Sequence, residues 1–260
     1  MTGMGTVISA DGTPIDFDRT GSGPPVVVLS AGPNDRSSSR PLVDVLKPFL
    51  TVYTYDHRGR GRSGDTSPHT AEREFEDLAA VIAEAGGSAG VFGHSGSGNI
   101  ALDAALHGVP ISRIAMYEPP YVVEGARSAI PPDWGMTVQR AIDAGNPGEG
   151  IYYWLAEVIE VPAEFVTQMR GTPFWDGMSA QAQGLVYDAE VLRGFTLPSA
   201  APDVPALVLD GGGMALPWVR AGIDALLELL PGARHESLEG QPHDVAPDAI
   251  APVLIKFFAE

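Results

Sequence analysis

The sequence contains no cysteine and few basic residues, and both shortages narrow the classes of protein that it encodes. Without cysteine, disulfide bonds and thiolate chemistry are excluded. The chain carries 16 lysine and arginine residues against 33 acidic ones, for a formal charge of -17. A surface of this sign repels nucleic acids and anionic lipid headgroups, so we expect neither nucleic acid nor membrane as a partner.

Long apolar runs and metal or nucleotide motifs are also missing from the sequence. No apolar segment approaches the roughly 20 residues that a membrane-spanning helix needs. Residues 1–17 lack the basic segment and apolar core of a signal peptide, so we expect a soluble, cytoplasmic protein. There is no P-loop, no H-E-x-x-H motif and no paired cysteine and histidine spacing, so we expect no metal and no organic cofactor.

Predicted strands and helices alternate along the 260 residues, with one long exception. Short strand-like runs recur from residue 6 to residue 118, and the alternation resumes with VPALVLD, ending in ARHESLE and a final helix. Residues 121–200 instead show helical patches separated by proline and glycine. We therefore predict an α/β core, residues 1–120 and 201–260, with a mostly parallel sheet covered on both faces. A helical cap, residues 121–200, is inserted before the seventh strand.

Residues 59–64, GRGRSG, match the G-x-G-x-x-G fingerprint of dinucleotide-binding proteins. In that fingerprint the glycines open a helix whose unpaired N–H groups hold the pyrophosphate. Here a loop, DTSPHTAE, follows the glycines, so the helix N-terminus is missing. The pattern does not support a dinucleotide cofactor.

Ser95 lies among glycines in GVFGHSGSGNIAL, residues 90–102, where a predicted strand ends and a helix begins. A serine in such a turn projects its hydroxyl above the carboxyl edge of the sheet, and small neighbours let strand and helix approach closely. Gly93 and Gly96 are such neighbours, and Ser97 takes the place of the last glycine in G-x-S-x-G. We interpret Ser95 as a nucleophile and the N–H of Gly96 as an oxyanion donor.

A serine nucleophile needs a base, which is usually a histidine oriented by a carboxylate. Of the six histidines, His243 lies in a loop between the last predicted strand and the final helix. This position fits a chain order of serine, then acid, then histidine. His94 adjoins the serine, and we expect its side chain to point away from Ser95, either into packing or into the pocket wall. We therefore predict His243 as the base.

Three segments together resemble capped serine hydrolases of the α/β-hydrolase fold superfamily. They are YDHRGRGRSGD, VFGHSGSGNIALDAA and LEGQPHDVAPDAIAPVLIKFF. With the strand order, the resemblance covers the chain except for the predicted cap. It implies an esterase-like activity, and it implies structural roles for Asp56 and Arg58.

The segment after the third predicted strand departs from the family pattern. Relatives commonly carry H-G-G there, whereas this chain has Ser30, Ala31, Gly32 and Pro33. The backbone N–H of Gly32 still supplies a second oxyanion donor, because that role does not need the histidine side chain. The Ser30 hydroxyl is a candidate to bind substrate or water, and packing is the alternative.

The acid of the triad is the second departure. Family members often place an aspartate a few residues after the strand that follows the cap, where this chain has Met214. Asp210 is near but ends that strand. Glu118 ends the strand before the cap and precedes Pro119, which favours an extended backbone. Some capped relatives take their acid from that strand end, so we predict Glu118 as the acid, with Asp210 as the alternative.

A serine rather than an aspartate at the nucleophile position favours acyl transfer. We expect hydrolysis of an ester, lactone or thioester of a small to medium hydrophobic molecule, by a monomer or a homodimer. Alternatives are a carbon–carbon hydrolase, lyase or cyclase with the same residues, and a ligand receptor without catalysis. Residues 119–200 hold 10 of the 20 aromatic residues, which indicates an apolar pocket. The candidate pocket residues are Ser30, His94, Trp154, Trp175 and Met214.

Overall fold

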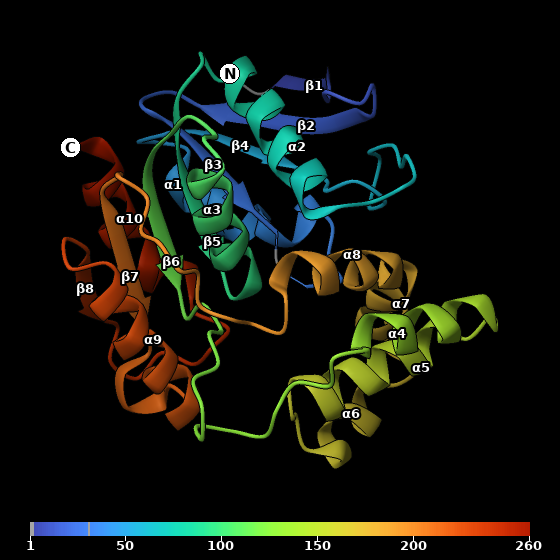
Figure 1. Ribbon diagram of the computed structural model, residues 1–260. Helices are drawn as coiled ribbons and strands as arrows, with labels where there is room; N and C mark the ends of the chain where they lie inside the picture. The colour runs from blue at the N-terminus through green and yellow to red at the C-terminus, as the bar shows by residue number, and fades with distance from the viewer. Residues whose placement is uncertain (1–2, 31) are drawn as a thin grey trace.

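The computed structural model describes residues 3–30 and 32–260, and an eight-stranded sheet runs through this part of the chain (Figure 1). The strands lie in the order β1-β2-β4-β3-β5-β6-β7-β8. Strand β2 is antiparallel to both of its neighbours, whereas β3 to β8 are all parallel. The strands are β1 (Gly3–Ile8), β2 (Pro14–Gly21), β3 (Pro25–Leu29), β4 (Thr51–Tyr55), β5 (Ala89–His94), β6 (Ile111–Tyr117), β7 (Ala206–Asp210) and β8 (Arg234–Ser237).

Helices cover both faces of this sheet (Figure 1). Strand β3 shows why, since Val26 and Val28 pack with α1 and α10, while Val27 and Leu29 pack on the face of α2, α3 and α9. A strand buried on both faces is apolar throughout. The arrangement confirms the predicted α/β fold with a mostly parallel, doubly covered sheet. These helices are α1 (Arg40–Leu46), α2 (Ala71–Glu84), α3 (Gly96–Leu106), α9 (Pro217–Leu229) and α10 (Pro247–Ala259), with short 3-10 turns η1 (Arg36–Ser39) and η3 (Gly212–Met214).

Further helices fill most of the chain between β6 and β7, and we call residues 134–192 the helical segment. In Figure 1 it lies on the side of the sheet where β6 ends. Trp134, Val138, Ile151 and Leu185 are buried among its helices. None of the helices in the described ranges is both long and apolar enough to cross a membrane. The elements of the helical segment are α4 (Trp134–Asp143), α5 (Pro147–Tyr153), the π-helix η2 (Trp154–Val158), α6 (Ala163–Met169), α7 (Pro173–Ala180) and α8 (Ala182–Leu192).

The glycine-rich turn directly after β4 is organised by buried charges. The Asp56 carboxylate accepts the backbone N–H of Arg36 at 2.8 Å and also pairs with its guanidinium. A Cβ on Gly61 would lie 2.2 Å from the same carboxylate, and its φ is 52°, so this position requires glycine. Arg58 is fully buried and bonds both oxygens of Asp77, at 2.7 and 2.8 Å. The buried ion pairs and the tight turn at Gly61 therefore give the glycine-rich motif at residues 59–64 a structural role.

Candidate active site

Ser95 occupies the sharp turn between β5 and α3, with φ of 57° and ψ of -135°. A non-glycine residue in this region is strained, and backbone bonds on both sides hold it. The Ser95 N–H donates to the Tyr117 carbonyl at 2.9 Å, and the Ser95 carbonyl accepts from Gly98 at 2.8 Å. A Cβ on Gly93 would lie 2.4 Å from the Ser97 carbonyl oxygen, so the approach of strand and helix requires glycine there. The turn has the form that presents a serine hydroxyl at a sheet edge.

Ser97 adds contacts to this turn that the sequence pattern did not predict. The His94 N–H donates to Ser97 Oγ at 3.0 Å, and Ser97 Oγ donates to the His94 carbonyl at 2.8 Å. Gly96 is the first residue of α3, where an N–H has no acceptor within the helix. Ser97 thus fastens the turn while the Gly96 N–H stands at the positive end of a helix.

His243 and Glu118 meet at the carboxyl edge of the sheet although 125 positions separate them. His243 Nδ1 donates to Glu118 Oε2 over 2.6 Å. Because a carboxylate only accepts, this bond leaves Nε2 of neutral His243 as an acceptor. The Glu118 side chain is 2% exposed, and its Oε1 accepts the N–H of Gly211 at 3.0 Å. The carboxylate is therefore fixed in the geometry that orients a histidine base. The backbone of Glu118 is not extended as Pro119 predicted, because its φ is 45°.

Asp210, the alternative acid, has a different partner. Its Oδ2 accepts from His235 Nε2 at 2.6 Å, and its Oδ1 accepts from Gly212 N at 2.6 Å. Burial raises the pKa of Asp210, but these hydrogen bonds outweigh it and hold the pKa below its ordinary value. The structure brings Glu118, and not Asp210, to His243.

Side chains from two strand ends hold the loop that carries His243. The Tyr117 hydroxyl donates to the Pro242 carbonyl at 2.8 Å, and His94 Nε2 donates to the His243 carbonyl at 2.8 Å. Burial and the neighbouring His243 lower the pKa of His94 to about 4, so His94 is neutral at pH 7. Of the two predicted placements, packing or the pocket wall, His94 takes the cavity wall, and it also anchors this loop.

A cavity of about 1170 Å³ opens at this edge of the sheet, and both Ser95 and His243 line it. No lysine or arginine belongs to its wall, as far as the described residues form it. Part of the wall is apolar and comes mainly from the helical segment: Trp154, Leu155, Ile159, Val161, Met169, Phe174, Met178, Leu192 and Phe195. Another part is polar: Ser30, Asn34, Asp35, Ser37, Ser38, Ser39 and Asp188. The candidate nucleophile and base thus share one amphiphilic cavity.

Two of the candidate pocket residues lie elsewhere. Trp175 is buried inside the helical segment, and the Arg170 guanidinium lies 5.3 Å from its ring centroid. Met214 is 57% exposed in the turn η3. The aromatic pattern did not separate residues that face the cavity from those that fill the helical segment, because both recur at helical spacing.

Gly32 lines the same cavity and has a φ of 55°. Its carbonyl accepts from Asn34 N at 2.9 Å and from Arg60 Nη1 at 2.8 Å. Ala31, the preceding residue of the predicted oxyanion loop, lies outside the described residues. Ser30 Oγ is buried and has no hydrogen-bond partner within residues 3–30 and 32–260. The structure therefore brings Gly32, Gly96 and Ser95 to one cavity.

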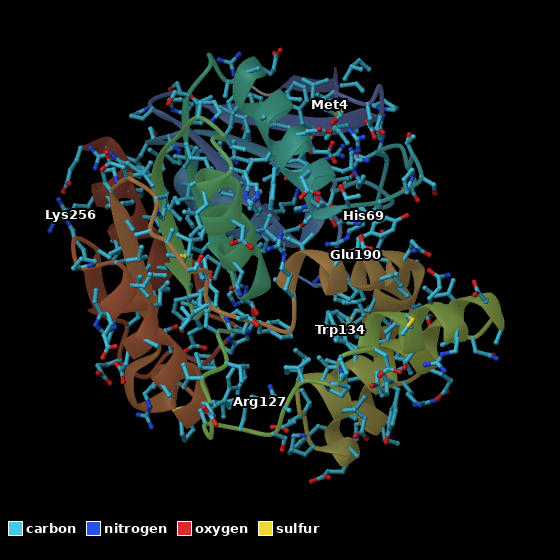
Figure 2. All side chains as sticks on the ribbon, viewed as in Figure 1. Met4, His69, Arg127, Trp134, Glu190 and Lys256 are labelled. Atoms are coloured by element: carbon cyan, nitrogen blue, oxygen red, sulfur yellow. The ribbon has the colours of Figure 1, made fainter. Side chains whose placement is uncertain are left out.

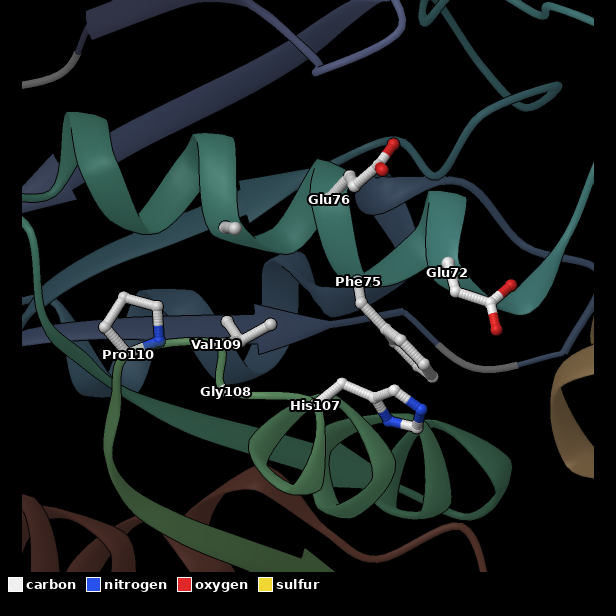
Figure 3. Close-up of a pocket in the computed structure, with 8 residues that line it drawn as sticks. Glu72, Phe75, Glu76, His107, Gly108, Val109 and Pro110 are labelled. Carbon is white, nitrogen blue, oxygen red and sulfur yellow. The ribbon is translucent and has the colours of Figure 1, made fainter.

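A second pocket, of about 320 Å³, lies between α2 and the carboxyl end of α3 (Figure 3). Glu72, Phe75 and His107 are in its wall, and the rings of Phe75 and His107 are 4.7 Å apart. Ser95 stands at the opposite end of α3, an 11-residue helix, so roughly 16 Å of helix separates them. Within the described part of the chain, no three His, Asp or Glu side chains group to hold a metal ion. The candidate nucleophile belongs to the larger cavity.

Comparison of the sequence with known proteins gives a match over most of the chain. Residues 26–249 match the model of the Alpha/beta hydrolase family. The RutD protein of Azorhizobium caulinodans, a candidate carbamate hydrolase, is 38% identical over 93 residues. The matched region spans 35% of this chain and 35% of that relative, about a third of its length.

Comparison with solved structures agrees with the family match. An alpha/beta hydrolase from Sphaerobacter thermophilus has a TM-score of 0.92 and 46% identity, covering 98% of this chain and 100% of that one. An esterase from Exiguobacterium antarcticum has a TM-score of 0.72 and 18% identity, covering 98% and 99%, which shows a shared fold. The chain belongs to the alpha/beta hydrolase family.

Proposed function

We propose that this protein is a serine hydrolase that cleaves an ester, lactone or thioester through an acyl-enzyme. One observation carries the proposal: the 2.6 Å bond from His243 Nδ1 to buried Glu118 leaves Nε2 as a base beside a cavity that Ser95 also lines. Family membership supports hydrolysis. The similar proteins include a candidate carbamate hydrolase and an esterase, and carbamates and esters are both carbonyl compounds.

In the acylation step, Ser95 Oγ attacks the substrate carbonyl while His243 Nε2 takes the hydroxyl proton. Glu118 stabilises the resulting imidazolium. The N–H groups of Gly32 and Gly96 donate to the oxyanion, and loss of one such donor lowers kcat roughly 10²–10³-fold in a serine enzyme. The tetrahedral intermediate then breaks its C–O or C–S bond, and His243 gives the proton to the departing alkoxide or thiolate.

In the deacylation step, His243 Nε2 removes a proton from water as its oxygen attacks the acyl carbonyl. The same N–H groups hold the second oxyanion. Collapse of this intermediate returns the proton to Ser95 Oγ and releases the carboxylic acid. The two steps together add one water molecule to the substrate and restore the enzyme.

The cavity supports an uncharged, largely apolar substrate of small to medium size. Its volume of about 1170 Å³ holds such a molecule. The wall includes Asp35, Asp188 and Asp244 and has no lysine or arginine among its described residues, and Arg60 behind it is already paired with Asp188. An anionic substrate loses its hydration there without gaining a cationic partner. We propose residues 121–200 as the cap that supplies the apolar part of the wall.

Hydrolysis of p-nitrophenyl butyrate and of a lactone panel by wild type and Ser95→Ala tests this function. We expect the substitution to lower kcat by roughly 10³-fold or more and to abolish labelling by a fluorophosphonate. Ser88→Ala, at an exposed serine before β5, is the control, and we expect it to retain both kcat and fluorophosphonate labelling. Equal turnover by wild type and Ser95→Ala contradicts the proposal. A wild type that is neither active nor labelled indicates a ligand receptor. A 1,3-diketone added to the substrate panel tests for carbon–carbon bond cleavage.

A further inference from the structure

Arg60 joins two parts of the chain that flank the candidate site. It lies in the turn after β4, and its side chain is 1% exposed. Nη1 donates to the Gly32 carbonyl at 2.8 Å, while Nη2 donates to the Gly184 carbonyl at 2.8 Å and to Asp188 Oδ1 at 2.5 Å. One planar guanidinium therefore holds the loop after β3 and helix α8 at a fixed separation.

Helix α8 packs closely against the Arg60 guanidinium. A Cβ on Gly184 would lie 1.9 Å from Arg60 Nε, so only glycine lets the helix approach so closely. Further along α8, Glu190 pairs with His69 at 2.9 Å, and Figure 2 shows these two residues where the core meets the helix. Contacts at several points therefore seat α8 on the core, among them a hydrogen bond from the Tyr187 hydroxyl to Asp65 at 2.7 Å.

Gly32 needs such restraint because glycine adopts positive and negative φ with similar ease. Its φ of 55° is accompanied by two donors on its carbonyl, Arg60 Nη1 and Asn34 N. On another side, a Cβ on Gly32 would lie 3.3 Å from Trp154 Cη2 in the helical segment. Arg60 and Asn34 thus restrain the Gly32 carbonyl, and Trp154 of the helical segment leaves little room beside its Cα.

We propose that Arg60 is a positioning residue, which aligns the Gly32 N–H with the oxyanion only while α8 is seated on the core. This inference rests on the proposed serine-hydrolase function. Arg60 is outside the described cavity lining, so it acts through Gly32, and through Asp188 it links oxyanion binding to the helical segment. Because the oxyanion forms only during reaction, the effect falls on kcat more than on KM.

The test compares Arg60→Lys with wild type on p-nitrophenyl butyrate, with kcat counted per fluorophosphonate-labelled site. A lysine ammonium lacks the planar fork that reaches both partners, so we expect kcat to fall roughly 10-fold to 100-fold while KM changes less than about threefold. Binding of a boronic acid, which mimics the tetrahedral intermediate, weakens by the same factor. Arg62→Met, at a 67% exposed arginine of the same turn, is the matched control and stays within about twofold.

A second variant, Asp188→Asn, keeps a neutral acceptor for Nη2 and loses only the charge. We expect it to lower kcat roughly threefold to tenfold, again with little change in KM. Thermal unfolding and near-UV circular dichroism establish that each variant is folded. An unchanged kcat per labelled site in folded Arg60→Lys, or a change confined to KM, overturns the positioning role. Failure of the proposed function differs: the wild type is then unlabelled, and Ser95→Ala hydrolyses the ester as fast.

Discussion

Replacing Glu118 by glutamine has a defined structural consequence, because its two carboxylate oxygens face two different donors. Oε1 accepts from Gly211 N at 3.0 Å, and Oε2 accepts from His243 Nδ1 at 2.6 Å. A glutamine amide has one oxygen, and the backbone N–H of Gly211 can only donate. The oxygen therefore turns toward Gly211, and the NH₂ group faces His243. Nδ1 must then accept, so the proton of His243 moves to Nε2, and His243 no longer deprotonates Ser95.

The size of the loss follows from this change of tautomer. In a serine protease, the equivalent change from carboxylate to amide lowers kcat roughly 10⁴-fold. We expect kcat to fall roughly 10³-fold to 10⁴-fold, which corresponds to about 4–5 kcal/mol of transition-state stabilisation. KM changes little, because Glu118 does not line the cavity formed by the described residues. The side chain keeps its size, so the variant folds.

Initial rates with p-nitrophenyl butyrate at neutral pH measure this effect. Asp210→Asn is the matched control, because it makes the same change on a carboxylate at the next strand end, which binds His235. We expect Asp210→Asn to stay within about threefold of wild type. A Glu118→Gln enzyme that keeps a tenth of wild-type kcat, or an Asp210→Asn enzyme that loses more kcat than Glu118→Gln, would exclude Glu118 as the acid.

Three further predictions concern the loop and the cavity. Burial holds the pKa of His94 at about 4, against 6.5 when unfolded, so the unfolded chain binds more protons between these values. The melting temperature therefore falls as the pH drops through this window, and His94→Gln reduces the slope of melting temperature against pH. An unchanged slope refutes this prediction. Tyr117→Phe leaves the Pro242 carbonyl without its donor, and urea unfolding should show a loss of about 1 kcal/mol. A nitrophenyl ester with a terminal carboxylate should have a kcat/KM roughly tenfold below its uncharged isostere, because the described wall offers no lysine or arginine. Equal values contradict the proposed substrate class.

The parallel strands were predictable because their sequences are short apolar runs that end at turn signals. PVVVL of β3 and ALVLD of β7 are buried along nearly their whole length. The sheet edge was less predictable: ARHESLE suggests a strand over 233–239, but β8 spans only Arg234–Ser237. An edge strand pairs on one side, so fewer contacts define its ends.

Parts of the site that depend on local pattern were also predictable, whereas long-range contacts were not. The strand, glycine and helix around Ser95 indicate the turn, and that turn is present. The sequence left Glu118 and Asp210 as alternatives, because spacing does not show which strand end His243 reaches. The sequence did not predict the contacts of Arg60, because its partners Gly32 and Gly184 lie 28 and 124 positions away.

The proposed mechanism requires that Ser95 be a nucleophile activated by His243 and Glu118. The intact mass of the fluorophosphonate adduct, with peptide mapping, measures this activation in wild type, Ser95→Ala and Glu118→Gln. We expect one adduct on the peptide that contains Ser95, none in Ser95→Ala, and labelling slowed by orders of magnitude in Glu118→Gln. A wild type without adduct, an adduct on another residue, or equal labelling rates in wild type and Glu118→Gln would contradict this mechanism.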